Sequence, residues 1–144
     1  MATQTQGKTG SERPSPGQTQ EARYERGLKK MAEIYGVPVE DFIAPLGDLG
    51  RYMVEFPYGD IYSRDGLAAR DREIATIAML TALGGREPQL RVHMNSALNV
   101  GLTPDELYEI ILHTLIFAGF PTAINALSVL DDFLSQHHGG EKNS

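Results

Sequence analysis

The feature that most constrains this chain of 144 residues is a series of apolar positions at helical spacing, interrupted repeatedly by glycine and proline. Over residues 22–35 the apolar side chains fall on one helical face, at Tyr24, Leu28, Met31 and Tyr35. Strand-type alternation of apolar and polar residues is not sustained anywhere in the sequence. The pattern therefore predicts an all-α protein.

The interruptions divide the chain into about six predicted helices. Their approximate bounds are residues 22–35, 38–53, 67–83, 88–100, 104–118 and 122–136. Pro45 and two glycines are expected to break the second helix, and the Pro-, Gly- and Asp-rich residues 57–66 are expected to form a loop. The clearest helix start is at Thr103, an N-cap followed by Pro104 and by Glu106, whose side chain can reach back to the cap amide.

Composition bounds the domain organisation. Residues 1–20 hold only Met1 and Ala2 as apolar positions, so they are predicted to be a disordered tail. One helical domain is expected over residues 21–137, and a second disordered tail over residues 138–144. His137 and His138 precede two glycines and are expected to belong to a solvated terminus.

Charge and cysteine content exclude several function classes. A formal charge of −6 is typical of a protein that does not bind nucleic acid, because phosphate affinity requires clustered cations. No segment has the length and hydropathy of a signal peptide or a membrane span, so we expect a soluble cytoplasmic protein that does not bind membranes. Cysteine is absent, which excludes disulfides and thiol redox chemistry from this chain.

Two predicted helices carry ionisable groups at apolar faces. Glu73 shares a face with Ile77 and Leu80, and His93 lies on the flank of an apolar stripe beside Ala97. Both positions also have an interpretation without catalysis. A histidine at the edge of a stripe is more often a hydrogen-bonded core residue, and an acid in a first helical turn is favoured by the helix dipole.

The predicted helix over residues 104–118 has two apolar faces. One contains Leu107, Ile110 and Ile111, and the other contains Ile116 and Phe117, with His113 among the second set. Two apolar faces on one short helix require two partners, which in a small domain indicates a subunit interface. Glu109 and His113 have the spacing of a metal pair, but no third ligand is evident, so no metal site is predicted.

Several segments in order resemble the carboxymuconolactone decarboxylase family. They are residues 59–67 (GDIYSRDGL), 70–74 (RDREI), 76–84 (TIAMLTALG), 90–93 (LRVH), 99–107 (NVGLTPDEL), 111–113 (ILH), 118–121 (AGFP) and 125–126 (NA). The resemblance covers roughly residues 22–135. It implies an alkylhydroperoxidase-like orthogonal helical fold that assembles into ring-shaped homo-oligomers, commonly trimers or hexamers, with sites near subunit contacts.

The resemblance also distinguishes two branches of the family. Thiol peroxidase-like members carry Cys-x-x-Cys ahead of the histidine that His93 matches, and the absence of cysteine excludes that chemistry here. The other branch is a cofactor-free decarboxylase that converts 4-carboxymuconolactone to 3-oxoadipate enol-lactone and carbon dioxide. This chain is similar to the second branch, which implies a small lactone or carboxylate substrate and no cofactor.

The resemblance implies roles for individual residues. His93 is the expected acid/base, Glu73 is expected to orient or recharge it, and Asp60 is a second candidate proton carrier. The candidate substrate-binding residues are Arg64, Arg72, Arg91 and, if the pocket lies between subunits, His113. The basic side chains are equally well explained as ion-pair partners at a subunit seam.

Departures from the family pattern leave the substrate open. The decarboxylases usually have Glu and Trp where Asp60 and Tyr62 stand, and often Ser where Glu73 stands. A glutamate at that position is more typical of the thiol branch, where it belongs to a proton relay with the histidine. Two alternatives therefore remain: a lyase or isomerase of another small acid in specialised metabolism, and a non-catalytic helical oligomer that binds a small acid.

Overall fold

The computed structural model describes residues 19–140, with side chains described as far as residue 137, and every regular element in this range is a helix. The elements are α1 (Gln20–Tyr35), α2 (Glu40–Ile43), the 3₁₀ helix η1 (Ala44–Leu46), α3 (Gly47–Met53), the π-helix η2 (Val54–Tyr62), α4 (Ala69–Leu83), α5 (Glu87–Asn99), α6 (Pro104–Ala118) and α7 (Phe120–Gly140). The predicted all-α class is confirmed. Residues 1–18 and 141–144 of the predicted tails lie outside the described range.

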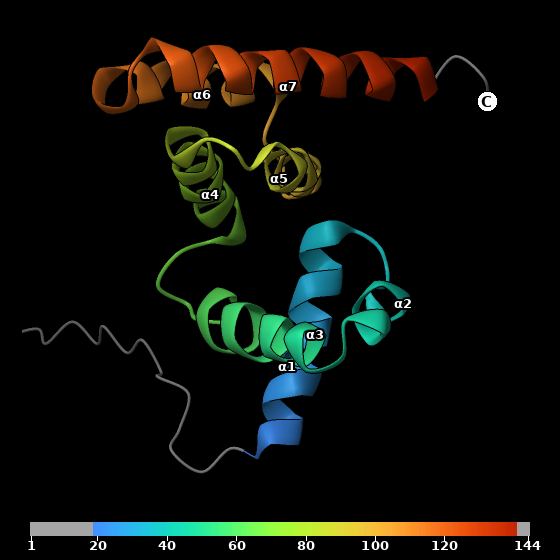
Figure 1. Ribbon diagram of the computed structural model, residues 1–144. Helices are drawn as coiled ribbons and strands as arrows, with labels where there is room; N and C mark the ends of the chain where they lie inside the picture. Colours follow the sequence, from blue (N-terminus) through green and yellow to red (C-terminus); the bar gives the residue numbers. More distant parts are fainter. Residues whose placement is uncertain (1–18, 141–144) are drawn as a thin grey trace, which may run out of the picture.

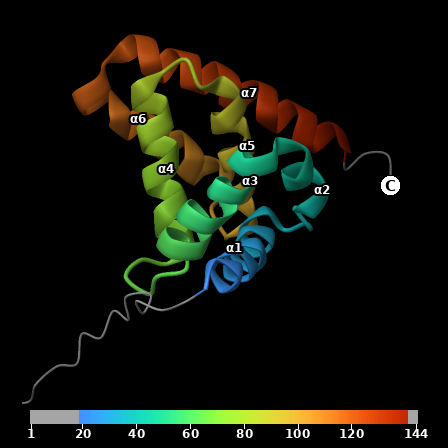
Figure 2. The ribbon, with the colours of Figure 1, turned by 60° about the horizontal axis from the view of Figure 1, so that its bottom comes forward.

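The helices form two groups in space (Figures 1 and 2). We call α1 through η2 the N-terminal unit and α4 through α7 the C-terminal unit. In Figure 1, α4 and α5 lie between the N-terminal unit below and α7 above, with α6 beside α7. None of the described helices is both long enough and apolar enough to cross a lipid bilayer.

Local chemistry sets several helix ends as predicted. Thr103 accepts a hydrogen bond from the backbone N–H of Glu106, and the Glu106 carboxylate accepts one from the backbone N–H of Thr103, which completes the capping box. Gly119 separates α6 from α7 at a φ of 82°, a left-handed value that favours glycine. The expected break of the second helix is also confirmed, because α2, η1 and α3 replace one continuous helix.

Two boundary predictions were wrong. Residues 57–62 were expected in a loop but belong to η2, because Tyr58 and Val54 are buried against α1 and this packing outweighs the weak helix propensity of Pro57 and Gly59. Pro57 cannot donate a backbone hydrogen bond, which is consistent with a departure from regular α-helical pairing at this segment. The last helix was expected to end near residue 136, but α7 continues to Gly140.

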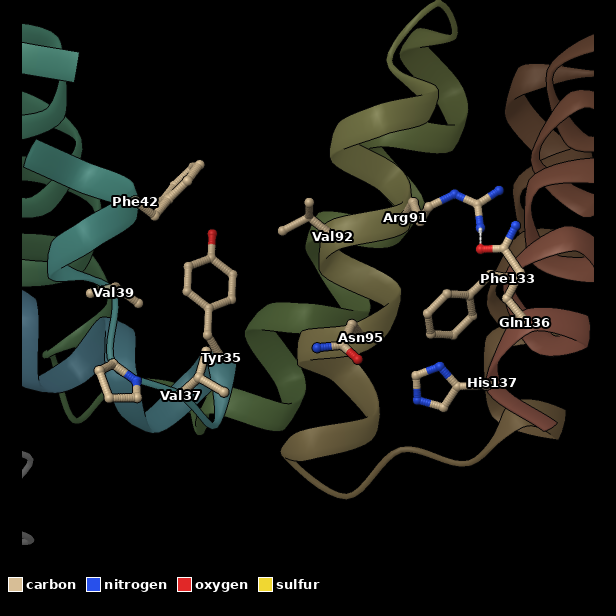
Figure 3. A pocket seen from close by; sticks show the side chains of 11 residues that line it. Tyr35, Val37, Val39, Phe42, Arg91, Val92, Asn95, Phe133, Gln136 and His137 are labelled. Carbon is tan, nitrogen blue, oxygen red and sulfur yellow. Dashed lines mark hydrogen bonds between the residues drawn. The ribbon is translucent and has the colours of Figure 1, made fainter. Parts of the chain in front are cut away.

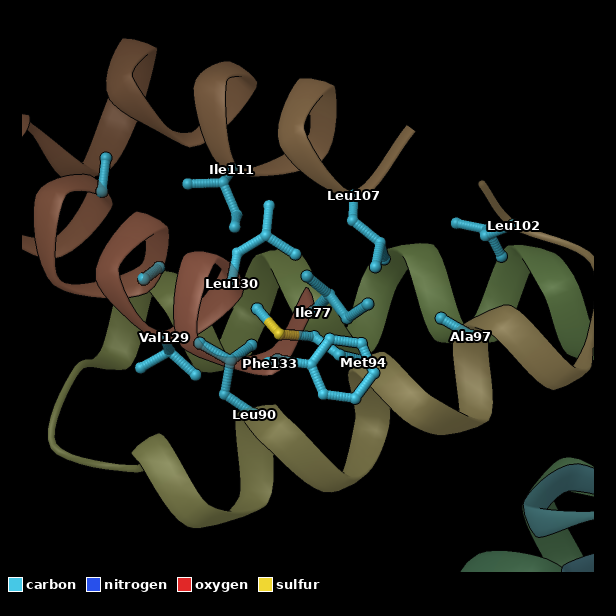
Figure 4. Packing of buried hydrophobic residues seen from close by; sticks show 12 residues of the cluster. Ile77, Leu90, Met94, Ala97, Leu102, Leu107, Ile111, Val129, Leu130 and Phe133 are labelled. Atoms are coloured by element: carbon cyan, nitrogen blue, oxygen red, sulfur yellow. The ribbon is translucent and has the colours of Figure 1, made fainter. Parts of the chain in front are cut away.

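The C-terminal unit has a core of aliphatic side chains from all four of its helices (Figure 4). Ile77, Met94, Leu107 and Ile111 are fully buried, and Phe133 of α7 packs among them. This interdigitated core holds α4 and α5 side by side. The relative placement of the polar residues on those two helices therefore depends on it.

The N-terminal unit is instead built on a close backbone approach of α1 to η2. A Cβ atom added at Gly27 would lie 2.3 Å from the Val54 carbonyl oxygen, and one added at Gly59 would lie 2.6 Å from the Arg23 carbonyl oxygen. Neither position has room for a side chain. The two glycines thus allow η2 to lie directly against α1. In this position the last residue of η2, Tyr62, contacts Glu73 of α4.

Candidate active site

Glu73 and His93 form an acid–imidazole pair between α4 and α5. Glu73 lies in the first half of α4 with a fully buried side chain, and His93 lies in the middle of α5 with a side chain that is 18% exposed. Glu73 Oε2 is 2.9 Å from His93 Nδ1. A carboxylate at Nδ1 orients the imidazole and leaves Nε2 as the nitrogen that can exchange a proton. The structure thus brings together the two residues that the helical spacing singled out.

Tyr62 contacts the other oxygen of the same carboxylate. The Tyr62 hydroxyl lies 3.0 Å from Glu73 Oε1 and 3.0 Å from Thr76 Oγ1. An ionised carboxylate only accepts hydrogen bonds, so Tyr62 donates to Glu73 and its own oxygen is left to accept from Thr76. Both carboxylate oxygens are therefore held, one by the N-terminal unit and one by α5.

Two further tyrosines lie behind Tyr62. The rings of Tyr58 and Tyr62 are stacked with centroids 5.0 Å apart, and the Tyr58 hydroxyl donates to the Tyr35 hydroxyl at 3.0 Å. Burial raises the pKa of Tyr62 to about 12, and burial also raises the pKa of Tyr58 and of Tyr35 above the ordinary tyrosine value. All three phenols are therefore neutral at physiological pH.

Arg72 places a cation beside this group. Its guanidinium carbon lies 5.8 Å from the centroid of the Tyr62 ring, within cation–π range, and its Nη2 donates to the Arg64 carbonyl oxygen at 3.3 Å. The Nε atom is buried and has no hydrogen-bond partner in the described part of the chain. An arginine that lacks a carboxylate partner can bind an anionic ligand through its free N–H groups.

Asp60 and Arg64 lie outside the Glu73–His93 pair. Asp60 forms an ion pair with Arg23 and lies 3.6 Å from a guanidinium nitrogen of Arg26, so it ties η2 to α1. The backbone carbonyl of Arg64 accepts a hydrogen bond from the Arg72 side chain. The structure does not bring the Asp60 carboxylate into contact with the acid–imidazole pair, and its role as a proton carrier stays a prediction.

Arg91 lines a separate cavity of about 450 Å³ between the α1–α2 junction, α5 and α7 (Figure 3). Its guanidinium contacts the Gln136 side-chain oxygen at 3.3 Å and lies 3.9 Å from Asp132. The other lining residues include Tyr35, Phe42, Val92, Asn95, Phe133 and His137. His137 was expected in a solvated tail, but it lies on α7 with its ring against Phe133.

His113 lies elsewhere, on the outer face of α6. It lines an apolar hollow with Ile74 of α4 and with Glu109, Leu112 and Ile116 of its own helix. The second apolar face of α6 is open to solvent, and Phe117 is 92% exposed. Among the described residues, no group of three His, Asp or Glu side chains gathers to hold a metal ion at Glu109 and His113 or elsewhere.

Sequence reasoning missed the hydroxyl groups of Tyr62 and Thr76 as site residues. Thr76 lies three residues after Glu73 on α4, so helical spacing could have placed it beside the carboxylate. The position of Tyr62 could not have been found in this way. Residues 57–66 were expected in a loop, and only the π-helix directs that side chain toward α4.

Comparisons with known proteins place the chain in a family. The model of the carboxymuconolactone decarboxylase family matches residues 47–132. A 4-carboxymuconolactone decarboxylase of Acinetobacter baylyi is 37% identical over 117 residues, which cover 78% of this chain and 87% of that protein. A nitrosuccinic acid decarboxylase of Metarhizium robertsii is 26% identical over 113 residues, covering 74% of this chain and 77% of that protein.

The fold and the matches together define the class of protein. This chain belongs to the carboxymuconolactone decarboxylase family, as its ordered motifs predicted. Its enzyme class is that of the carboxy-lyases. An uncharacterised 15.0 kDa protein of Paracoccus denitrificans is also 37% identical, over 78 residues that cover 54% of this chain and 58% of that protein.

Proposed function

We propose that the protein is a cofactor-independent decarboxylase of 4-carboxymuconolactone or of a similar small acid, with His93 as the proton donor. The observation that carries the proposal is the 2.9 Å contact between Glu73 Oε2 and His93 Nδ1, in which the carboxylate is buried and the imidazole keeps an exposed edge. This arrangement supports acid–base chemistry at Nε2.

In the proposed reaction the bond between the substrate and its carboxylate carbon breaks, and carbon dioxide leaves. The electron pair of that bond moves into the conjugated lactone carbonyl and forms a dienolate. The His93 imidazolium then donates the proton on Nε2 to carbon, and solvent restores that proton for the next turnover. The buried Glu73 carboxylate stabilises the imidazolium before transfer and orients the neutral ring afterwards. The reaction involves no net oxidation or reduction.

Arg72 is the proposed binding group for a substrate carboxylate. Its buried Nε lacks a partner within the described residues, and its guanidinium lies over the ring of Tyr62, which contacts Glu73. An anion bound at Arg72 would therefore lie close to the acid–imidazole pair. Arg64 follows Tyr62 by two positions and is a second candidate cation at this edge.

The names of two relatives indicate which substrates to consider for this protein. One is a 4-carboxymuconolactone decarboxylase and another is a nitrosuccinic acid decarboxylase, so related chains act on chemically different small acids. Asp60 and Tyr62 stand where the resemblance leads us to expect Glu and Trp, and the change at Tyr62 lies directly beside Glu73. We therefore propose a small carboxylic acid as the substrate class, with 4-carboxymuconolactone as the first compound to assay.

We also propose that the active form is a homo-oligomer, a trimer or a hexamer. The exposed side chains of Ile116 and Phe117 at the end of α6 and of Phe120 and Ile124 at the start of α7 support this, because a monomer rarely exposes such a set of large apolar residues. A neighbouring subunit that covers this face would also cover the hollow that His113 lines.

The test of the proposed function is carbon dioxide release from 4-carboxymuconolactone and nitrosuccinate by the purified protein, with no metal or cofactor added. His93→Ala is expected to lower kcat by about 10²–10⁴-fold, the usual contribution of a general acid. His137→Ala, on α7, is the matched control and removes an imidazole that does not contact Glu73. Full turnover by His93→Ala would refute the acid/base assignment.

The proposed role of Arg72 has its own test. Arg72→Gln is expected to raise KM with the assembly intact in gel filtration, whereas Arg86→Gln at the exposed start of α5 should not. Dissociation of Arg72→Gln into monomers with an unchanged KM would indicate an ion-pair role at a subunit seam.

A second candidate function is the binding of a small acid without turnover. The cavity of about 450 Å³ beside Arg91 favours it, because aromatic side chains of Phe42 and Phe133 flank a cation and the Asn95 amide. Benzoate is a suitable probe, and Arg91→Gln is expected to weaken its binding in a calorimetric titration. Benzoate binding that depends on Arg91, together with no carbon dioxide release from any acid assayed, would favour this function.

A further inference from the structure

We propose that Tyr62 is a positioning residue of the acid–imidazole pair, whose hydroxyl holds the Glu73 carboxylate and thereby sets the orientation and tautomer of His93. The inference rests on the proposed function, since it names the group on which proton donation by His93 depends. It assigns the N-terminal unit a part in a reaction whose other groups lie in the C-terminal unit.

The two contacts of Glu73 are coupled through one rigid group. Tyr62 holds Oε1 at 3.0 Å and His93 Nδ1 holds Oε2 at 2.9 Å, so a rotation of the carboxylate disturbs both hydrogen bonds. The Glu73 side chain is fully buried, and bulk water cannot replace a lost donor. Without the phenol, a buried carboxylate oxygen loses its donor, and the carboxylate gains freedom to turn.

The polarity of this chain of hydrogen bonds runs in one direction. The Thr76 hydroxyl donates to Tyr62, Tyr62 donates to Glu73, and Glu73 accepts from His93 Nδ1. Burial raises the pKa of Tyr62 to about 12, so the phenol keeps its proton at neutral pH. When the ring is neutral, the contact with Glu73 therefore favours the Nδ1–H tautomer of His93 and leaves Nε2 without a proton.

The Tyr62 ring is itself held on both sides. Tyr58 stacks against it with an interplanar angle of 29°, and the Arg72 guanidinium lies over it at 5.8 Å. Tyr62 is also the last residue of η2, which lies close against α1 because Gly27 and Gly59 have no side chains. A donor fixed in this way positions the carboxylate more strictly than water could.

The test compares two tyrosine variants from the same stack. Tyr62→Phe keeps the ring and removes the hydroxyl that contacts Glu73. Tyr58→Phe is the matched control, because it removes a hydroxyl whose partner is Tyr35 and keeps the stacked ring. We expect Tyr62→Phe to lower kcat by about 10–100-fold with KM changed by less than about 2-fold, and Tyr58→Phe to change neither by more than about 2-fold.

A second measurement needs no substrate. The ¹⁵N chemical shifts of the His93 ring nitrogens report which nitrogen carries the proton. At a pH at which the His93 ring is neutral, the wild-type protein and Tyr58→Phe are expected to show the Nδ1–H tautomer, and Tyr62→Phe is expected to show a mixture of both tautomers. Thr76→Val is a second control: it removes the hydroxyl that donates to Tyr62 and leaves the Tyr62 donor to Glu73 in place, so the His93 spectrum should not change.

The outcomes separate this inference from the proposed function. Equal kcat in Tyr62→Phe and Tyr58→Phe, with an unchanged His93 spectrum, would overturn the positioning role while decarboxylation stands. If the wild-type protein releases no carbon dioxide from any acid assayed, the proposed function fails. The His93 spectra still confirm or overturn the positioning of Glu73 and His93 by Tyr62. If Tyr62→Phe does not fold, Tyr62→Met, which also removes the hydroxyl and fills the space with a flexible apolar side chain, decides the question by the same two measurements.

Discussion

The helices within the N-terminal unit and the helices within the C-terminal unit are packed by different kinds of contact. In the C-terminal unit, large aliphatic side chains such as Ile77, Leu107 and Ile111 fill the space between helices. In the N-terminal unit, Gly27 and Gly59 bring α1 and η2 into backbone contact, and a smaller set of buried side chains surrounds Met31. The C-terminal unit therefore depends on large side chains that fill its core. The N-terminal unit depends on two positions that have no side chain.

The two units also differ in the partner of their most buried carboxylate. In the N-terminal unit, ion pairs join helices: Asp60 of η2 pairs with Arg23 of α1, and the buried Glu55 pairs with Arg51. In the C-terminal unit the one fully buried charged side chain among the described residues, Glu73, pairs with His93 instead of an arginine. A carboxylate paired with an imidazole can take part in proton transfer near neutral pH, whereas one paired with a guanidinium cannot.

The acid–imidazole pair depends on both units. The aliphatic core fixes the distance between Glu73 and His93, and the glycine-seated π-helix supplies the phenol of Tyr62 that completes the hydrogen-bonding of the carboxylate. Neither unit holds the site by itself. Variants that weaken one unit selectively therefore test whether the two units contribute separately to stability.

The largest expected effect is in the aliphatic core. Leu107→Ala is expected to lower the free energy of unfolding by about 2–5 kcal/mol, because the fully buried leucine leaves a cavity among four helices. Urea unfolding measures the change, with the exposed Leu49→Ala as the control, for which less than about 0.5 kcal/mol is expected. A loss below about 1 kcal/mol for Leu107→Ala would show that the C-terminal core is loosely packed.

A smaller loss is expected from the backbone contact of the N-terminal unit. Gly27→Ala places a methyl group 2.3 Å from the Val54 carbonyl oxygen and is expected to cost about 1–3 kcal/mol, because η2 must move away from α1. Hydrogen exchange should increase in residues 20–62 before it increases in α6. Gly66→Ala is the control, since nothing lies within 4 Å of its Cβ. Equal exchange in both units would refute separate contributions.

The ion pair between Asp60 and Arg23 is expected to contribute less. Both side chains are partly exposed, at 21% and 34%, so Asp60→Asn should cost about 1 kcal/mol or less. The difference from wild type should shrink at high ionic strength, because salt screens partly exposed charges. Thermal unfolding at low and high salt measures it, with Asp65→Asn in the exposed loop as the control. A salt-independent loss would indicate packing rather than charge.

The smallest expected effect is an acid dependence in the C-terminal unit. The backbone N–H of Thr103 and the side chain of Arg70 lower the pKa of Glu106 below its ordinary value. A lowered folded-state pKa means that this contribution is present above the unfolded-state pKa and is lost as the pH falls through the folded-state value. Glu106→Gln should therefore narrow the gap in thermal stability between pH 7 and pH 3. Glu109→Gln, on the exposed side of α6, is the control, and an equal narrowing in both would contradict the prediction.

Much of the fold was predictable because its signals are local. The spacing of apolar residues in α4 and α5 placed Glu73 and His93 at buried faces, and Thr103 with Glu106 marked the start of α6. The π-helix was not predictable in the same way. Pro57 and Gly59 indicate a loop when only neighbouring residues are considered, and packing of Tyr58 against α1 overrides them.

By itself, the sequence determined the all-α class, the helix boundaries that depend on capping, the family and the exclusion of thiol chemistry, because each depends on residue type and short-range spacing. Tertiary structure alone decided that Asp60 pairs with Arg23, that Arg91 lines a separate cavity, and that Tyr62 reaches Glu73. These features join residues that are distant in sequence, and those that involve Asp60 and Tyr62 depend on how closely two glycines allow η2 to approach α1.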